Sequence, residues 1–132
     1  MPPDDSRFLR RLADGVLIFD GAIGTSIHAL ELPLSDYQGQ ENCSEILNLT
    51  RPDAVERLHR GFLEVGCDVV ETNTFGGNRV VLAEFGLADR VHEINRAAAQ
   101  IARRACDALA TPTQPRFVAG SLGPGTKLIS LR

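Results

Sequence analysis

The chain has 132 residues, a length that allows one domain at most, and 43% hydrophobic with 23% charged residues gives material for an apolar core. A net charge of -3 with scattered Lys and Arg argues against a nucleic-acid partner and against a polybasic membrane patch. Residues 1–11 have no apolar segment typical of a signal peptide, and no run approaches the ~20 apolar residues of a membrane span. We therefore expect a cytoplasmic protein with no nucleic-acid and no membrane partner.

Neither the cysteines nor the histidines form a metal-binding pattern. The cysteines are odd in number and widely spaced, which is typical of reduced thiols in the cytoplasm and not of a disulfide framework. There is no C-x-x-C pair and no histidine spacing typical of a metal site, so packing or surface roles are expected for all six residues. They are Cys43, Cys67, Cys106, His28, His59 and His92.

The N-terminal third predicts a short helix, a buried strand and an irregular segment. A helix is expected over residues 7–13. Residues 16–19 form a continuous apolar run that is too short for a helix and is followed by Asp-Gly, which predicts a strand buried on both faces. Residues 33–49 contain breakers such as Pro33 and Gly39, so we expect irregular structure there.

A helix with well-marked ends is predicted next. Thr50 is the expected N-terminal cap, Pro52 lies in the first turn, and Gly66 ends the helix. A second strand ending in polar residues should cover 68–75. On the helix before this strand, apolar residues repeat at helical spacing and form one stripe. It consists of Val55, Leu58, Phe62 and Val65.

The C-terminal half predicts two helices and a third strand. The helices are expected over 80–85, closed by Gly86, and over 89–109; the strand follows a Pro/Thr loop and covers 117–120. The order β-α-β-α-β with long crossovers predicts three parallel strands, adjacent in chain order, with helices on one outer face. The buried side of the long helix should carry Val91, Ile94, Ala98, Ile101 and Ala105.

Three polar clusters follow the three predicted strands, and ligands of parallel α/β folds gather at the carboxyl ends of the strands. In the first, residues 20–25, small residues let backbone N–H groups approach an anion, and Asp20 could accept a hydrogen bond from an ammonium group. This pattern suits the two charged ends of an amino acid. It equally fits a tight strand-to-helix turn in which Asp20 is a local cap, and both interpretations stay open.

The other two clusters differ in how strongly they indicate a site. Residues 71–75 place a carboxylate, two hydroxyls and an amide after an apolar strand, and burying the Glu71 carboxylate without a partner would be costly. This favours a functional role over a structural one. Residues 120–127 approach a phosphate-binding loop but fail the pattern, because Lys127 follows Thr126 instead of preceding it.

Taken in order, four segments resemble the homocysteine S-methyltransferase family, and within it the homocysteine-binding domain of cobalamin-dependent methionine synthases. The segments are 20–25, 42–53, 71–75 and 120–124, and the resemblance runs from about residue 10 to the end. Each motif alone is weak, but four in the same order and at matching intervals are specific.

The resemblance implies an α/β fold, the N-terminal portion of a (β/α)₈ TIM barrel that binds homocysteine and zinc. Zinc would lower the pKa of the homocysteine thiol from about 8.5, and the thiolate would attack the methyl group of methylcobalamin. The cobalamin and folate domains would lie further along a longer chain. Ile23 departs from the Met usual in the family. The substrate-binding positions carried over are Asp20, Gly21, Ala22, Gly24, Thr25, Glu71, Thr72, Asn73 and Ser121.

One departure decides what this chain is expected to do alone. The family's zinc is held by cysteines at the ends of later strands, including an adjacent pair, and this sequence has no adjacent cysteines. It also provides three predicted strands, whereas a closed barrel needs eight strands and about 250 residues. We therefore expect a truncated barrel domain, no stoichiometric zinc, and no methyl transfer by the isolated chain.

Two alternatives and one question of assembly remain open at this point. The chain could instead be a non-enzymatic module that binds a small molecule or a partner through the partial barrel. A nucleotide-binding doubly wound sheet is disfavoured, because no G-x-G-x-x-G motif exists. Self-association is expected, since the inner strand faces and outer edges lack partners, unless residues 26–49 fold back over the open side.

Overall fold

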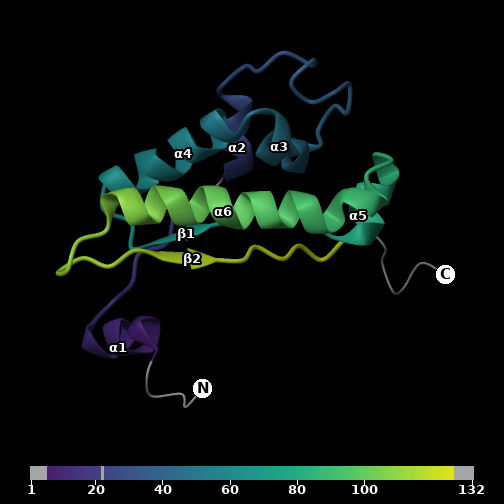
Figure 1. Ribbon diagram of the computed structural model, residues 1–132. Helices are drawn as coiled ribbons and strands as arrows, with labels where there is room; N and C mark the ends of the chain where they lie inside the picture. The colour runs from purple at the N-terminus through teal and green to yellow at the C-terminus, as the bar shows by residue number, and fades with distance from the viewer. Residues whose placement is uncertain (1–5, 22, 127–132) are drawn as a thin grey trace.

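Two short parallel strands lie against two long helices in a computed structural model, which describes residues 6–21 and 23–126 (Figure 1). Short helices precede the first long helix and lie between the two long helices along the chain. The described elements are α1 (Arg7–Asp14), α2 (Ile23–His28), η2 (Ser44–Ile46), α3 (Leu47–Thr50), α4 (Pro52–Glu64), β1 (Val69–Glu71), α5 (Arg79–Glu84), η3 (Ala88–Arg90), α6 (Val91–Leu109) and β2 (Phe117–Ala119).

The sheet has two strands where the sequence predicted three. β1 and β2 pair in parallel with Val70 opposite Val118. The first predicted strand forms only a single parallel bridge, between Phe19 and Val69, supported by a 3.0 Å hydrogen bond that the N–H of Asp20 donates to the carbonyl of Val69. The prediction of three full strands is therefore wrong, although the segments do lie parallel and adjacent in chain order.

The first segment is also exposed, whereas its apolar run predicted burial on both faces. Val16 is 82% exposed, Ile18 57% and Phe19 44%. One of its edges meets β1, and no described residue pairs with the other edge. A continuous apolar run is typical of a strand whose two faces are both covered by packed layers, and the described residues leave the side chains of residues 16–19 largely uncovered.

Both long helices lie on the same face of the strands, as predicted (Figure 1). In the core between them, Leu63 of α4 and Ala102 and Ala105 of α6 pack on Val70 of β1. The predicted buried side of α6 is confirmed, with Ile94, Ala98, Ile101 and Ala105 all buried and Val91 partly so.

The end of α4 agrees with the prediction, because Glu64 is its last residue and Gly66 follows the C-cap with a φ of 112°. The start of α4 and the burial of its last predicted apolar residue differ. Its N-cap is Arg51, without a side-chain cap bond. The Thr50 hydroxyl instead donates to the carbonyl of Ile46, 3.2 Å away, within the preceding turn. Val65 lies at the C-cap and is exposed, whereas His59 and Leu63 are buried. The cap prediction failed because a second helix, α3, ends where α4 begins and occupies Thr50.

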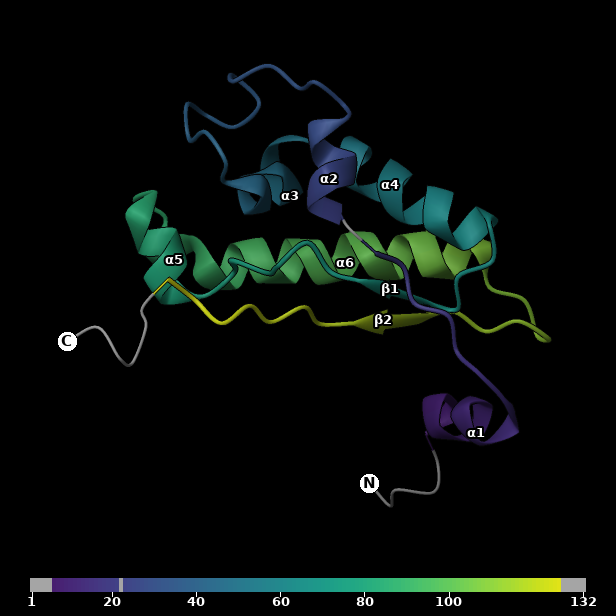
Figure 2. The same cartoon turned by 180° about the vertical axis from the view of Figure 1, so that it is seen from behind.

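Residues 26–49 are not irregular throughout, and they do not cover the open side of the strands. They contain η2 and α3, and their apolar residues Ile27 and Leu47 pack against Val55 of α4 and Ile101 of α6. The segment therefore lies over the helices. The opposite side of the strands faces α1 (Figure 2), from which Phe8 makes an edge-to-face contact with Phe117 at a centroid distance of 5.4 Å.

We predict that the 132-residue chain self-associates. The free edge of residues 16–19 and their exposed apolar side chains provide unpaired backbone groups and apolar area that a second copy would cover. Light scattering on dilute, salt-matched samples should give a mass above that of one chain. Replacing Ile18 with Lys should shift the population toward monomer, and a monomeric wild type that unfolds cooperatively would contradict the prediction.

Candidate functional site

A cavity of about 560 Å³ opens where the two strands end. Its wall combines the start of α2, the turn before α3, the loop after β1, helix α5 and the residues after β2, so segments far apart in the sequence meet there. The lining residues are Ile23, Gly24, Asn42, Ser44, Glu45, Glu71, Asn73, Phe75, Gly76, Val81, Glu84, Phe85, Ser121, Gly125 and Thr126.

Four of the nine positions proposed from the sequence line this cavity. Gly24, Glu71, Asn73 and Ser121 do so. The other described positions do not form its wall, and Ala22 lies outside the described residues. The positions away from the wall are Asp20, Gly21, Thr25 and Thr72.

Asp20 lies directly behind the wall and is coupled to Glu71. Its Oδ1 accepts a hydrogen bond of 2.9 Å from the backbone N–H of Glu71. Burial, together with the negative charge of Glu71, raises the pKa of Asp20 to about 6. The charged form of Asp20 is thus disfavoured in the fold and costs stability as the pH rises through 6. A cation placed near both carboxylates would remove this cost.

Thr72 has a structural role that explains its absence from the wall. Its hydroxyl lies 2.7 Å from that of Thr74, which donates to the carbonyl of Ser121 at 2.8 Å. The backbone N–H of Ser121 in turn donates to the Thr72 hydroxyl at 3.2 Å. These bonds join the loops after β1 and β2, so Thr72 fixes Ser121 in the wall and is itself buried.

Asn73 lines the cavity and also fixes the turn before α3. Its amide nitrogen donates to the carbonyl of Ser44 at 2.8 Å and to Oδ1 of Asn48 at 3.1 Å. Asn48 returns a 2.8 Å bond to the carbonyl of Asn73. Both amide hydrogens of Asn73 are thereby used within the protein, which leaves its oxygen as the group available to a ligand.

Glu45 belongs to the wall and was missed as a site residue. It is only 6% exposed, and its Oε1 accepts a 2.7 Å hydrogen bond from the N–H of Gly76. The segment 42–53 was noted for its resemblance alone. A single carboxylate beside the apolar run Ile46-Leu47 was the available signal, because a buried charge in such a run needs a specific partner.

The charge of the cavity wall is of one sign. Glu45, Glu71 and Glu84 contribute carboxylates, whereas none of the lining residues is Lys, Arg or His. Glu45 is buried and Glu71 half-buried, and neighbouring carboxylates favour an added cation. The apolar part of the wall is formed by Ile23, Phe75, Val81 and Phe85. The geometry therefore suits a small molecule with a cationic group and a short apolar part.

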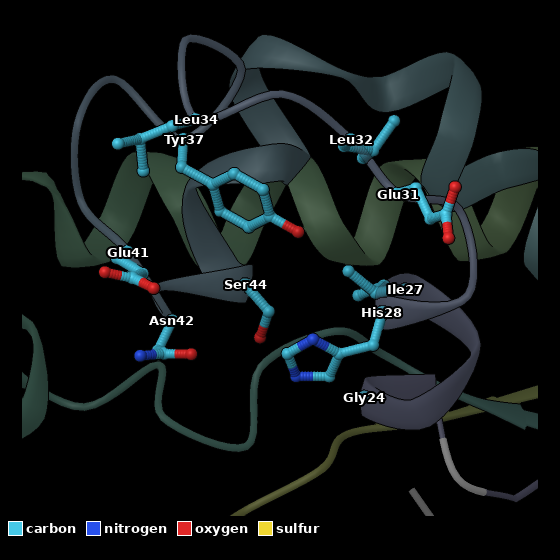
Figure 3. A pocket seen from close by; sticks show the side chains of 10 residues that line it. All are labelled: Gly24, Ile27, His28, Glu31, Leu32, Leu34, Tyr37, Glu41, Asn42 and Ser44. Carbon is cyan, nitrogen blue, oxygen red and sulfur yellow. The ribbon is translucent and has the colours of Figure 1, made fainter.

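A second cavity of about 410 Å³ adjoins the first and shares Gly24, Asn42 and Ser44 with it. Figure 3 shows Tyr37 from the 30–43 loop and His28 from α2 extending into the space between these two segments. Of the sequence-proposed positions only Gly24 lies here. The chemistry suggested by the strand ends thus belongs to the first cavity.

The described residues do not assemble a metal site. Among residues 6–21 and 23–126, no three His, Cys, Asp or Glu side chains come close enough together to hold an ion. The three cysteines are buried apart from one another, with the thiols of Cys67 and Cys106 donating to the carbonyls of Phe19 and Phe117.

None of the described helices is long and apolar enough to cross a membrane.

The chain is similar to known enzymes over nearly its whole length. It is 48% identical over 127 residues to the methionine synthase of Mycobacterium leprae (strain TN), covering 96% of this chain and 10% of that protein. With the methionine synthase of Mycobacterium tuberculosis (strain ATCC 25618 / H37Rv) it shares 47% identity over 127 residues, 96% of this chain and 11% of that protein. The chain therefore spans about a tenth of the length of these relatives.

Two solved structures have a fold similar to that of this chain. The homocysteine methyltransferase MmuM from Escherichia coli matches in its oxidized form with a TM-score of 0.73 at 23% identity, over 89% of this chain and 41% of that one. Its metallated form matches with a TM-score of 0.71 at 27% identity, over 88% and 41%. The family model of homocysteine S-methyltransferases matches residues 17–131. The chain belongs to the homocysteine S-methyltransferase family.

Proposed function

We propose that this chain is the N-terminal part of the homocysteine-binding barrel of a methionine synthase, and that the cavity at its strand ends holds the amino-acid part of homocysteine. The observation that carries the proposal is the cluster of carboxylates at the ends of neighbouring parallel segments, with the pKa of Asp20 raised to about 6 beside Glu71. The 48% identity to a methionine synthase supports the same substrate.

Each side chain has a specific task in this proposal. Glu71 accepts hydrogen bonds from the ammonium group, and Asp20 behind it adds negative charge and holds the Glu71 backbone through its 2.9 Å bond. The backbone of Ser121 is fixed by Thr72 and Thr74, and its hydroxyl donates to the ligand carboxylate. The oxygen of Asn73 accepts from the ligand. Gly24 leaves space at the start of α2, and Gly21, Ala22 and Thr25 shape the turn that leads there.

Zinc and cobalamin belong to the proposed function but not to these residues. The described residues offer no set of metal ligands, so no step is assigned to a metal here. A zinc-bound thiol would be a thiolate at neutral pH, and we propose that the ligands for it, and the cobalamin and folate domains, lie elsewhere in a longer cytoplasmic enzyme. The coverage of 10% of a relative's length is consistent with this arrangement.

We predict that the isolated chain binds L-homocysteine but does not methylate it. Without a metal the thiol keeps a pKa near 8.5, so only about 3% of it is thiolate at pH 7. Titration calorimetry should detect binding, methylcobalamin should yield methionine at the protein-free rate, and elemental analysis should find less than stoichiometric zinc. Absence of binding would refute the pocket assignment, and methionine formation above the protein-free rate would refute the inactivity.

A further inference from the structure

Phe75 combines an exposed aromatic ring with a firmly held backbone. Its side chain is 61% exposed and lines the cavity at the strand ends. An aromatic ring left in water forgoes the free energy that its burial would provide. Large apolar side chains that are exposed on a rigid support are typical of binding surfaces, because their contact with a ligand costs little ordering.

Three elements fix the loop that carries Phe75. Glu45, just before α3, accepts the N–H of Gly76 at 2.7 Å. Gly123, after β2, donates its N–H to the carbonyl of Phe75 at 3.0 Å. From α6, Asn95 donates to the carbonyl of Gly77 at 2.7 Å. The loop is therefore held on both sides of Phe75 by residues distant in sequence.

The ring itself lies against the backbone of Gly123. A Cβ atom placed on Gly123 would be 2.9 Å from both Cδ1 and Cε1 of the Phe75 ring, and 2.4 Å from its carbonyl oxygen. Only glycine allows this approach. One edge of the ring is thus packed on the backbone of Gly123. The remaining ring surface belongs to the apolar part of the cavity wall, whereas Glu71 belongs to its charged part.

We propose that Phe75 is a specificity-determining residue that contacts the sulfur-bearing end of the bound amino acid. This rests on the proposed binding of homocysteine in the same cavity. The carboxylates hold the ammonium end and do not distinguish a thiol from a hydroxyl, whereas contact with an apolar, polarisable ring does so in the metal-free chain. A sulfur atom at an aromatic ring gains about 0.3–1.5 kcal/mol, which corresponds to about a 2- to 10-fold change in affinity.

The test compares L-homocysteine with L-homoserine, in which oxygen replaces sulfur, by calorimetry on the 132-residue chain and its variants. The wild type should prefer homocysteine. Phe75→Ala should lose about 2- to 10-fold in homocysteine affinity, with homoserine affinity unchanged, and Phe75→Leu should fall between the two. Leu122→Ala, which removes an exposed apolar side chain outside the cavity wall, should match the wild type.

The outcomes distinguish a failure of the role proposed for Phe75 from a failure of the proposed homocysteine binding. Equal loss of both ligands in Phe75→Ala and Phe75→Leu would assign Phe75 a purely structural role and overturn the inference. Unchanged homocysteine affinity in both variants would also overturn it, since the ring would then lie away from the ligand. A wild type that binds neither amino acid would refute the proposed function itself, and the role of Phe75 with it.

Discussion

Replacing Glu71 with glutamine is expected to weaken homocysteine binding about 10- to 100-fold, because a hydrogen bond to a charged group contributes about 1.5–3 kcal/mol. The Glu71 side chain lines the cavity and makes no side-chain hydrogen bond to the described residues, so the fold should not depend on it. Calorimetry gives the affinity, and circular dichroism checks that the variant remains folded.

The same substitution has a second consequence that affinity alone would not reveal. The negative charge of Glu71 contributes to raising the pKa of Asp20 to about 6. In Glu71→Gln that pKa should fall, and NMR titration of the Asp20 carboxyl measures it. The matched control is Glu64→Gln, an exposed carboxylate on α4 outside the cavity. Affinity unchanged in Glu71→Gln, or equally reduced in Glu64→Gln, would contradict the assignment.

His59 is expected to contribute a loss of about 2 kcal/mol of folding stability between pH 7 and pH 5. Asp20 partly offsets this loss in the wild type, because its pKa is raised to about 6 and its protonation favours the folded chain. The His59 side chain is fully buried in α4, and neither ring nitrogen has a hydrogen-bond partner among the residues that the structure describes. Burial lowers the pKa of His59 to about 4, with the charge of Glu56 acting weakly in the opposite direction. The unfolded histidine, with a pKa near 6.5, takes up its proton first.

The direction of the pH effect follows from the pKa of His59, which is about 4 in the folded chain and near 6.5 in the unfolded chain. Above pH 6.5 the histidine is neutral in both states, and its burial carries no charge penalty. As the pH falls from 6.5 toward 4, protonation stabilises only the unfolded chain, so folding stability decreases. The effect should be visible in urea unfolding curves recorded at pH 7, 6 and 5.

Variants of two histidines test whether His59 causes this loss of folding stability. His59→Leu keeps an apolar side chain of similar size in the core and should remove most of the loss between pH 7 and 5. His92→Gln, on the exposed side of α6, should retain the wild-type pH dependence. If His59→Leu loses stability with pH as steeply as the wild type, the titrating group is another residue.

The sequence predicted most of the elements and part of the site. Helical spacing placed the buried side of α6 correctly, including Ile94 and Ala98, because a long periodic pattern reports which face is covered. Glu71, Asn73, Ser121 and Gly24 line the cavity, and all four belong to the segments after the predicted strands, where ligands of parallel sheets bind. The position of Asp20 outside the wall was not predictable, since its bond to the Glu71 backbone joins residues 51 apart in the chain.

What the sequence determined by itself was local periodicity and the family motifs, which depend on residues close together in the chain. What only the tertiary structure decided was pairing over long separations. Residues 16–19 carry a strand pattern but form one bridge and stay exposed, since the burial of a strand depends on the layers that distant parts of the chain pack on its faces. Glu45 became part of the site only through its bond to Gly76, and Phe75 became a fixed ring only through Gly123. These contacts join segments 31 and 48 residues apart, and no local pattern encodes them.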